Sequence, residues 1–409
     1  MQSHYDAQLK DTVRYLGKTL GQTIKAQLGN DWLEKIEKVR LDGRASFKGD
    51  TDSSENLKET FKTMSDSELL VVARAFAQFL NLGNIAEQEY NAGLDLDASI
   101  DSLFSHLDKA ELSALEVEEA VAKLDIDLVL TAHPTEVFRR TLIHKHKELA
   151  YCLKSIHHEQ LSDTERNRLE TRIADLISQA WHTEEIRSVR PTPVDEARWG
   201  FSVIENSLWD AVPDFLRDLD ERLQQDYNVK LPIDAAPIHF SSWMGGDRDG
   251  NPFVTAKVTE EVLLLARRRA AKLLTIDLDR LQVELSMNDC NDELKDAVGE
   301  QYEPYRALLR PLVKRCADTR DGIYDFFNGR PYDSSEWIAS NDELLEPLLM
   351  CYRSLCESGL EVTANGMLLD TIRRVKCFGV HLLRLDVRQD SQRHADVLSE
   401  VTRYLGLGD

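Results

Sequence analysis

The sequence predicts an α/β protein that is predominantly helical, and three observations predict this class. Apolar residues recur every three or four positions along most of the chain, which is the spacing of helices that bury one face. Three short segments break this rhythm, at 125–131, 237–243 and 378–387, and each is bounded by Gly, Pro or charged residues. Long helical stretches separate these segments, which favours parallel strands in a sheet or barrel of βα units.

The first 124 residues are predicted to form a helical region of their own. Its amphipathic stretches are 12–40, 66–90 and 101–124. Gly29 and Asn30 divide the first stretch, because these residue types commonly end helices. The second stretch opens with Ser65–Glu68 (SDSE), a helix-capping pattern, and residues 48–54 (KGDTDSS) form the best loop candidate. We place residues 125–409 in a second region that carries the strands.

The spacing of the strands is wider than in a plain barrel. More than a hundred residues lie between Leu130 and Trp243, whereas a plain βα unit has roughly 30 residues. Either large helical insertions intervene, or the strands belong to a barrel whose other strands are encoded elsewhere. Three strands cannot close a barrel.

The charge balance limits the classes of ligand. The 409 residues include 72 acidic and 50 basic side chains, which gives a net charge of −22. Nucleic-acid binding needs a basic surface, so we expect no nucleic-acid partner. An anionic substrate must be held by a local basic cluster that works against this overall field.

Three further features favour a cytoplasmic protein without a membrane span. Residues 1–10 are polar and lack the apolar core of a secretion signal. We find no run of about 18 apolar residues. No CxxC pair occurs, so we expect reduced thiols. The cysteines are Cys152, Cys290, Cys316, Cys351, Cys356 and Cys377.

His133 lies at the predicted carboxyl end of the first strand, in the run VLTAHPTEVFRRT (129–141). Pro134 suits the first turn of a helix, and the free N–H groups of a helix start favour anions. Arg139 and Arg140 follow, and guanidinium groups match phosphate or carboxylate oxygens. The alternatives are a structural histidine and a solvated pair of arginines.

The second segment runs into the loop SSWMGGDRDGNPFVT (241–255). A calcium loop is excluded, because Gly250 is the fourth residue counted from Asp247 and not the sixth. A P-loop is excluded because no GxxxxGK[ST] pattern is present. The small residues therefore indicate a tight loop that lets charged groups approach a ligand. Trp243 either forms a wall of that site or belongs to the core.

Arg384 lies in the third segment, LLRLDVRQDS (382–391). On a strand its side chain points away from those of its apolar neighbours. Burying an arginine is costly unless it is paired or faces a polar cavity. It either faces such a cavity or forms an internal ion pair with Asp386 or another acid.

Other arginines add to the basic inventory. The run EEIRSVRPTPVDEARWGF (184–201) supplies Arg187 and Arg190, and Asp195 then opens a helix in the position that the helix dipole favours. Arg267–Arg269 lie in the middle of a predicted helix, where we expect a solvated face.

Four runs, TAHPTE, RPTPVDEARWGF, WMGGDRDGNP and LLRLDVRQDS, occur in this order and resemble phosphoenolpyruvate carboxylases. The resemblance implies an incomplete TIM-type (βα)8 barrel with large helical insertions, of which 125–409 are the first part. It also implies that phosphoenolpyruvate and bicarbonate are joined into oxaloacetate and phosphate. Bicarbonate attacks the phosphorus, and the resulting CO₂ then carboxylates the enolate.

The resemblance also assigns roles to single residues. His133 matches a catalytic histidine that acts as acid and base on carboxyphosphate. Arg384 matches a phosphate-binding arginine, and Trp243 matches a wall beside the substrate methylene that keeps water off the enolate. Arg139, Arg140 and Arg187 resemble positions that hold an activating sugar phosphate in some members. Those members also carry a basic residue after GNP, where this chain has Phe253.

The family is roughly twice as long as this chain, and no GRGG loop occurs in it. We therefore expect an N-terminal portion that is inactive alone, with the ligands of Mg²⁺ or Mn²⁺ in the other half and a homotetrameric whole enzyme. The alternative is a non-catalytic module that binds phosphorylated metabolites or a full-length subunit.

Overall fold

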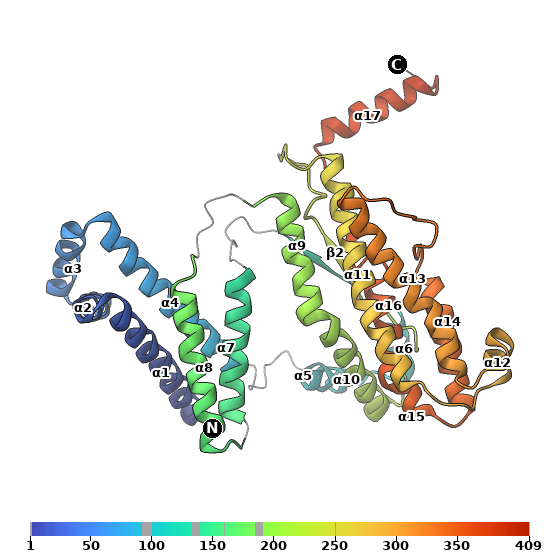
Figure 1. Ribbon diagram of the computed structural model, residues 1–409, viewed down its shortest axis with the longest axis horizontal. Helices are drawn as coiled ribbons and strands as arrows, with labels where there is room; N and C mark the ends of the chain where they lie inside the picture. Colours follow the sequence, from blue (N-terminus) through green and yellow to red (C-terminus); the bar gives the residue numbers. More distant parts are fainter. Residues whose placement is uncertain are drawn as a thin grey trace. The chain divides into compact units, whose positions relative to one another are not determined.

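The computed structural model describes residues 2–91, 100–131, 140–158, 160–184, 191–249 and 251–408. Their contacts divide the chain into two compact units, each built from two stretches of sequence (Figure 1). The first unit comprises Met1–Ser99 and Val137–Val189, and the second comprises Ile100–Glu136 and Arg190–Asp409.

This division differs from the boundary that we expected after residue 124. Phe104 and Val117, which precede that boundary, are buried in the core of the second unit. Leu149 and Ile173, which follow it, are buried in the core of the first. The apolar pattern of a helix shows that one face is buried, but it does not show which core that face joins. The sequence therefore did not reveal that residues 100–136 belong to the second unit and residues 137–189 to the first.

The first unit is entirely helical within the described residues. Its helices are α1 (Gln2–Leu28), α2 (Asn30–Phe47), α3 (Thr51–Thr63), α4 (Asp66–Asn91), α7 (Arg140–His158) and α8 (Asp163–Trp181). The predicted break is confirmed at Gly29, whose φ of 94° suits glycine. The predicted cap is also confirmed, since the Glu68 carboxylate accepts a hydrogen bond from the Ser65 N–H. The predicted loop at 48–54 is mostly wrong, because α3 already begins at Thr51, with Asp50 as its N-cap.

Helix α4 reaches the length and apolar character of a membrane span over Asp66–Tyr90, which the sequence analysis did not expect. A core helix passes the same test. Val72, Ala75, Leu82 and Ile85 of α4 are buried in the core of the first unit, and α4 packs against α1 and α7. Its apolar face is therefore explained by packing within the unit.

The second unit combines helices with one small sheet. Up to the second strand its elements are α5 (Ile100–Lys109), α6 (Ala114–Ala122), β1 (Ile126–Leu130), α9 (Pro193–Val203), the π-helix η1 (Ile204–Leu208), α10 (Trp209–Tyr227) and β2 (Ile238–Ser242). They continue with α11 (Ala256–Glu284), α12 (Asp292–Val298), α13 (Pro304–Phe327), α14 (Asp342–Glu357), α15 (Glu361–Thr363), the π-helix η2 (Ala364–Leu368), α16 (Leu369–Phe378), β3 (Arg384–Leu385) and α17 (Ser391–Tyr404).

The three strands form one parallel sheet in the order β1-β2-β3. The predicted α/β class with a predominance of helix is thus confirmed. The third strand is shorter than predicted and covers only Arg384 and Leu385. Gly379 ends α16 with a φ of 64°, and Leu382 adopts a φ of 70°, so the backbone before Arg384 is not extended.

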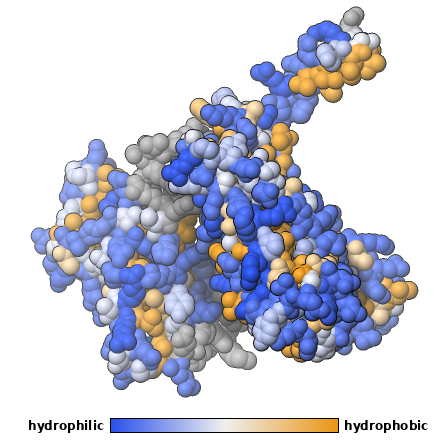
Figure 2. Space-filling model, turned by 45° about the vertical axis from the view of Figure 1, so that its right-hand side comes forward, coloured by the Kyte–Doolittle hydropathy of each residue, from blue (hydrophilic) through white to orange (hydrophobic). Residues whose placement is uncertain are grey.

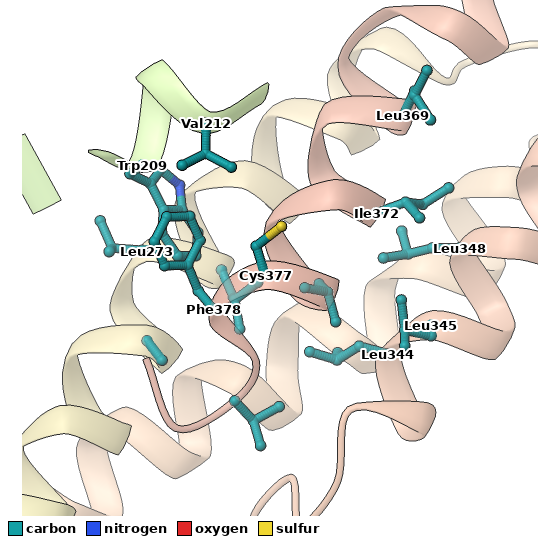
Figure 3. Close-up of a cluster of buried hydrophobic side chains, with 14 of the residues drawn as sticks. Trp209, Val212, Leu273, Leu344, Leu345, Leu348, Leu369, Ile372, Cys377 and Phe378 are labelled. Carbon is teal, nitrogen blue, oxygen red and sulfur yellow. The ribbon is translucent and has the colours of Figure 1, made fainter. Parts of the chain in front are cut away.

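The middle strand joins the sheet to the helical core. Phe240 of β2 stacks on Phe378 at a ring-centroid distance of 4.9 Å, and Phe378 stacks on Trp209 at 5.0 Å. Figure 3 shows Trp209 beside Phe378 and Leu273 in this cluster. Central β2 is thereby anchored, whereas Leu128 and Val129 of β1 are 46% and 43% exposed.

The expectation of a solvated face at Arg267–Arg269 is wrong. The guanidinium of Arg267 lies 5.4 Å from the centroid of the Trp337 ring, and that of Arg268 lies 5.0 Å from the Tyr324 ring. Arg269 forms an ion pair with Glu205 of η1. Long arginine stems cover apolar surface while the charged heads find partners, which a run of charges in the sequence does not reveal.

The cysteines are unpaired, as the sequence predicted. Burial raises the pKa of Cys316 and Cys351 to about 12, which is typical of unreactive core thiols.

Candidate functional site

The carboxyl ends of the three strands meet at one edge of the sheet. The Trp243 N–H donates to the Leu130 carbonyl oxygen over 3.1 Å, which places the end of β2 beside the end of β1. The Asp386 N–H donates to the Ser242 carbonyl oxygen over 3.0 Å, which does the same for β3. Three of the runs singled out in the sequence therefore begin or pass at this edge, where parallel α/β proteins carry their sites.

The loop after β2 pairs with the chain after β3 through one further parallel β-bridge, between Asp247 and Arg388. The Arg388 N–H donates to the Gly246 carbonyl oxygen over 3.0 Å, and the Arg248 N–H donates to the Arg388 carbonyl oxygen over 2.9 Å. A Cβ atom on Gly246 would lie 2.1 Å from the Asp386 carbonyl oxygen. Glycine is therefore required at this crossing, as the prediction of a tight loop implied.

Thr259 of helix α11 forms hydrogen bonds that hold the loop after β2 in place. The Thr259 hydroxyl donates to the Gly245 carbonyl oxygen over 2.8 Å, and it accepts a hydrogen bond from the Arg248 guanidinium over 3.1 Å. Gly245 has a φ of 85°, and a Cβ there would lie 2.6 Å from a methyl group of Val262. This packing fixes the loop backbone at the sheet edge.

Trp243 is half-buried and forms part of a charged cluster. The guanidinium of Arg388 lies 4.4 Å from the centroid of its ring, a cation–π distance. The same guanidinium lies 3.5 Å from a carboxylate oxygen of Asp247 and 3.9 Å from one of Asp249. Trp243 is thus only partly buried, and one face of its indole is covered by a cation at the site, an environment unlike that of a core tryptophan.

Arg388 is the site residue whose role the sequence analysis missed. It lies in the run LLRLDVRQDS (382–391), in which only Arg384 was expected to contribute to a site. Its contacts reach Trp243 and Asp247, about 140 positions earlier in the chain. Local spacing carries no signal for such a pairing; only the parallel alignment of β2 and β3 creates it.

Arg384 lies on β3 opposite Ser241 of β2 and is exposed. It makes no ion pair with Asp386, the acid that the alternative named. Within the described residues no acidic side chain neutralises its guanidinium. A guanidinium that has no acidic partner in the described part of the chain and lies at the carboxyl edge of a sheet is suited to meet an anion.

The remaining predicted site residues lie where the structure gives no side-chain position. His133, Arg139 and Arg187 fall outside the described residues. Arg140 begins helix α7, and its side chain is likewise outside them. Phe253, which stands in the place of the basic residue expected for sugar-phosphate activation, is 68% exposed. The predicted effector cluster thus stays a prediction.

The described donor groups near the sheet edge do not form a metal site. Within the described ranges no three His, Cys, Asp or Glu side chains lie together as a set of ligands. Asp247 and Asp249 face the Arg388 guanidinium. This positive charge would repel a metal cation and already pairs with both carboxylates. These residues do not fit a metal site of their own.

Comparison with known proteins gives one consistent result. The family model for phosphoenolpyruvate carboxylase matches residues 9–409. Phosphoenolpyruvate carboxylase of Tolumonas auensis is 51% identical over 411 residues, covering 98% of this chain and 46% of that protein. The Aeromonas salmonicida protein of the same name is 51% identical, covering 98% and 47%, and that of Vibrio vulnificus is 50% identical, covering 98% and 47%. This chain spans about half the length of these relatives, and it belongs to the phosphoenolpyruvate carboxylase family.

Proposed function

We propose that this protein serves as a phosphoenolpyruvate carboxylase, joining phosphoenolpyruvate and bicarbonate into oxaloacetate and phosphate. The observation that carries the proposal is the meeting of two family runs, WMGGDRDGNP and LLRLDVRQDS, at the sheet edge where β1 also ends. There, Trp243 directly follows β2, and the exposed Arg384 lies on the adjacent strand β3. The relatives that share about half of their residues with this chain bear that name.

The finer fold proposal is an incomplete TIM-type (βα)8 barrel with large helical insertions. Parallel pairing of β1, β2 and β3 in chain order supports it, since barrel strands follow one another in this way. The half-exposed apolar residues of β1 also support it, because a barrel strand is covered on both faces. We propose residues 125–409 as the first part of that barrel.

Both substrates are anions, so neutralisation of charge is expected to be the largest catalytic contribution. We assign binding of the phosphate to Arg384. When a bicarbonate oxygen attacks the phosphorus, the bond from phosphorus to the enol oxygen breaks, and carboxyphosphate and the enolate form. The indole of Trp243, held by Arg388, walls the methylene side and keeps water from protonating the enolate.

His133 is the proposed proton carrier. Its imidazole takes the proton of carboxyphosphate, which then separates into CO₂ and phosphate. The enolate carbon forms the new bond to CO₂ and gives oxaloacetate. The support for this assignment is its place in the sequence, three residues after Leu130, which ends β1 and accepts a hydrogen bond from the Trp243 N–H.

The remaining proposals concern the whole enzyme. We propose Mg²⁺ or Mn²⁺ as its cofactor, and no step above passes through a metal because the described residues hold no set of ligands. We further propose a cytoplasmic homotetramer, with Arg139, Arg140 and Arg187 as candidate effector ligands.

The test joins this chain in frame to the second half of the Tolumonas auensis relative. We expect the soluble chimera to form oxaloacetate from phosphoenolpyruvate and ¹³C-bicarbonate, and the 409-residue chain alone to form none. His133→Asn in the chimera is expected to lower kcat by about 100-fold or more. The matched control is His144→Asn, since His144 is exposed on α7.

A folded chimera without activity, beside an active relative in the same assay, would contradict the proposed function. Near-normal turnover of His133→Asn would remove only His133 from the mechanism.

A further inference from the structure

The first unit contains a large groove, whereas the sheet edge described above belongs to the second unit. The groove has a volume of ≈ 990 Å³ and is lined by helices α1, α2 and α4. Its floor is apolar and includes Leu20, Ile24, Ile36 and Phe79. Gly17 allows the Phe79 ring to pack closely against α1, because a Cβ at position 17 would lie 2.9 Å from that ring.

Basic side chains follow both rims of this groove. They are Lys10, Arg14, Lys18 and Lys25 of α1 and Arg40 and Arg44 of α2. Arg14 is paired with Asp11, and Arg40 with Glu37. Within the described residues the other four make no ion pair, and all four are exposed. A chain of net charge −22 thus presents a local surface of opposite sign, and such a surface attracts acidic partners.

The arrangement of these cations indicates the shape of the occupant. Lys10, Lys18 and Lys25 are separated by eight and seven residues, so they recur every two turns on one side of α1. They extend over roughly 22 Å of helix at a rise of 1.5 Å per residue. A single anionic head group needs cations that converge on one point. A row of cations instead matches a row of acids on another helix.

The size of the groove agrees with this interpretation. Two turns of a helix, with a diameter of about 10–12 Å and a length of roughly 11 Å, displace on the order of 10³ Å³. Two turns also suffice to present apolar residues at i, i+3 or i+4, and i+7 to the floor.

We propose that this groove binds an acidic amphipathic helix of a protein partner. The apolar face of that helix lies on the floor formed by Leu20, Ile36 and Phe79. Its acidic flanks face the unpaired cations Lys18 and Lys25 on one rim and Arg44 on the other. The site does not depend on the carboxylase chemistry.

The test uses the 409-residue chain and a fluorescein-labelled, amidated 14-residue peptide. The peptide carries Leu at i, i+4, i+7 and i+11, and Glu on both sides of that stripe. We expect saturable binding by fluorescence anisotropy, weakened when NaCl rises from 50 to 300 mM. The double variant Lys18→Glu and Lys25→Glu is expected to raise Kd by about tenfold or more.

The matched control is Lys38→Glu with Lys58→Glu, which changes the net charge equally at exposed positions that do not line the groove. It is expected to leave Kd within about twofold. A second control is a peptide of the same composition whose Leu residues do not share one face. Circular dichroism must show that both double variants keep their helix content.

Equal weakening by both double variants would overturn the proposal, as would equal binding of the rearranged peptide or no binding at 100 µM peptide. A Kd that rises only for the groove variant supports it.

Discussion

Gly246 lies where the loop after β2 crosses the chain after β3, and its lack of a side chain is a steric requirement. A Cβ would meet the Asp386 carbonyl oxygen at 2.1 Å, and this oxygen belongs to backbone that cannot rotate away. We predict that Gly246→Ala lowers the free energy of unfolding by about 2–4 kcal/mol, because the loop and the strand must separate. Urea unfolding measures the change.

Gly200 provides the matched control for Gly246. A Cβ at Gly200 would also come close to another atom, at 2.2 Å, but that atom is the terminal methyl of Met244, which can change rotamer. Gly200 lies in helix α9, where alanine favours the helix by about 1 kcal/mol. We expect Gly200→Ala to stay within about 1 kcal/mol of the unchanged protein. Equal losses at both positions would show that the kind of neighbour is unimportant.

Glu68 gives the first unit a dependence on pH. Hydrogen bonds from the Lys35 ammonium and from Ser65 lower the pKa of Glu68 to about 2. Because its pKa in the unfolded chain is about 4.3, the stabilising contribution of Glu68 is present above that pH and is lost as the pH falls toward 2. We predict that Glu68→Gln lowers the thermal midpoint of the first unit at pH 7 but not near pH 2.

Midpoints of both proteins measured between pH 2 and pH 7 check this prediction. A gap between them that stays constant over the whole range would show that Glu68 acts through packing and not through its charge.

At the scale of the element, η2 contains a kink whose free carbonyl groups are hydrogen-bonded by a residue of helix α10. Gly366 has non-helical angles, with φ −79° and ψ −137°. Arg217 of α10 donates to the carbonyl oxygens of Asn365 and Gly366 over 2.7 and 3.0 Å, and it pairs with Asp370 over 2.6 Å. The backbone groups that the kink takes out of the helix are therefore satisfied by a charged donor.

We predict that Arg217→Met lowers the free energy of unfolding by about 2–3 kcal/mol, because the two carbonyl oxygens and Asp370 lose their donor. It should also speed amide hydrogen exchange in residues 361–369. The control is Arg310→Met, since Arg310 is exposed on α13. If exchange in 361–369 is unchanged in Arg217→Met, the arginine does not hold the kink.

Helix α17 has an apolar face that no described neighbour covers. Its spacing is amphipathic, yet none of its residues is buried, and Val397, Leu398 and Val401 are exposed. Figure 2 shows this apolar surface at the carboxyl end of the chain. The pattern identifies the helix, and the structure shows no neighbour that covers it among the described residues.

At the scale of the whole molecule, each unit has its own hydrophobic core. Ile173 is fully buried in the first core, and Phe240 is 2% exposed in the second. We predict two unfolding transitions, because separate cores do not enforce one cooperative event. Ile173→Ala should lower one transition and Phe240→Ala the other, each by about 3 kcal/mol or more.

Pulsed hydrogen exchange with mass spectrometry during a urea titration assigns each transition to its unit. Ile173→Val is the conservative control, with an expected loss of about 1 kcal/mol. A single transition that both alanine substitutions shift equally would contradict the prediction.

The sequence by itself determined the helices, the class and the family. Helical spacing and the break at Gly29 are local properties, and the order of four runs in the sequence indicates the family. The sequence also predicted strands near Trp243 and Arg384, because a short apolar run bounded by Gly or charged residues is a local pattern.

Only the tertiary structure decided which of these residues meet. The cation of Arg388 over Trp243, the crossing at Gly246 and the exchange of helices between the units all join positions remote in the chain. A periodic pattern specifies that a face is buried but not its neighbour. Neighbours are fixed by strand pairing and by the packing of whole elements, and both depend on the complete fold.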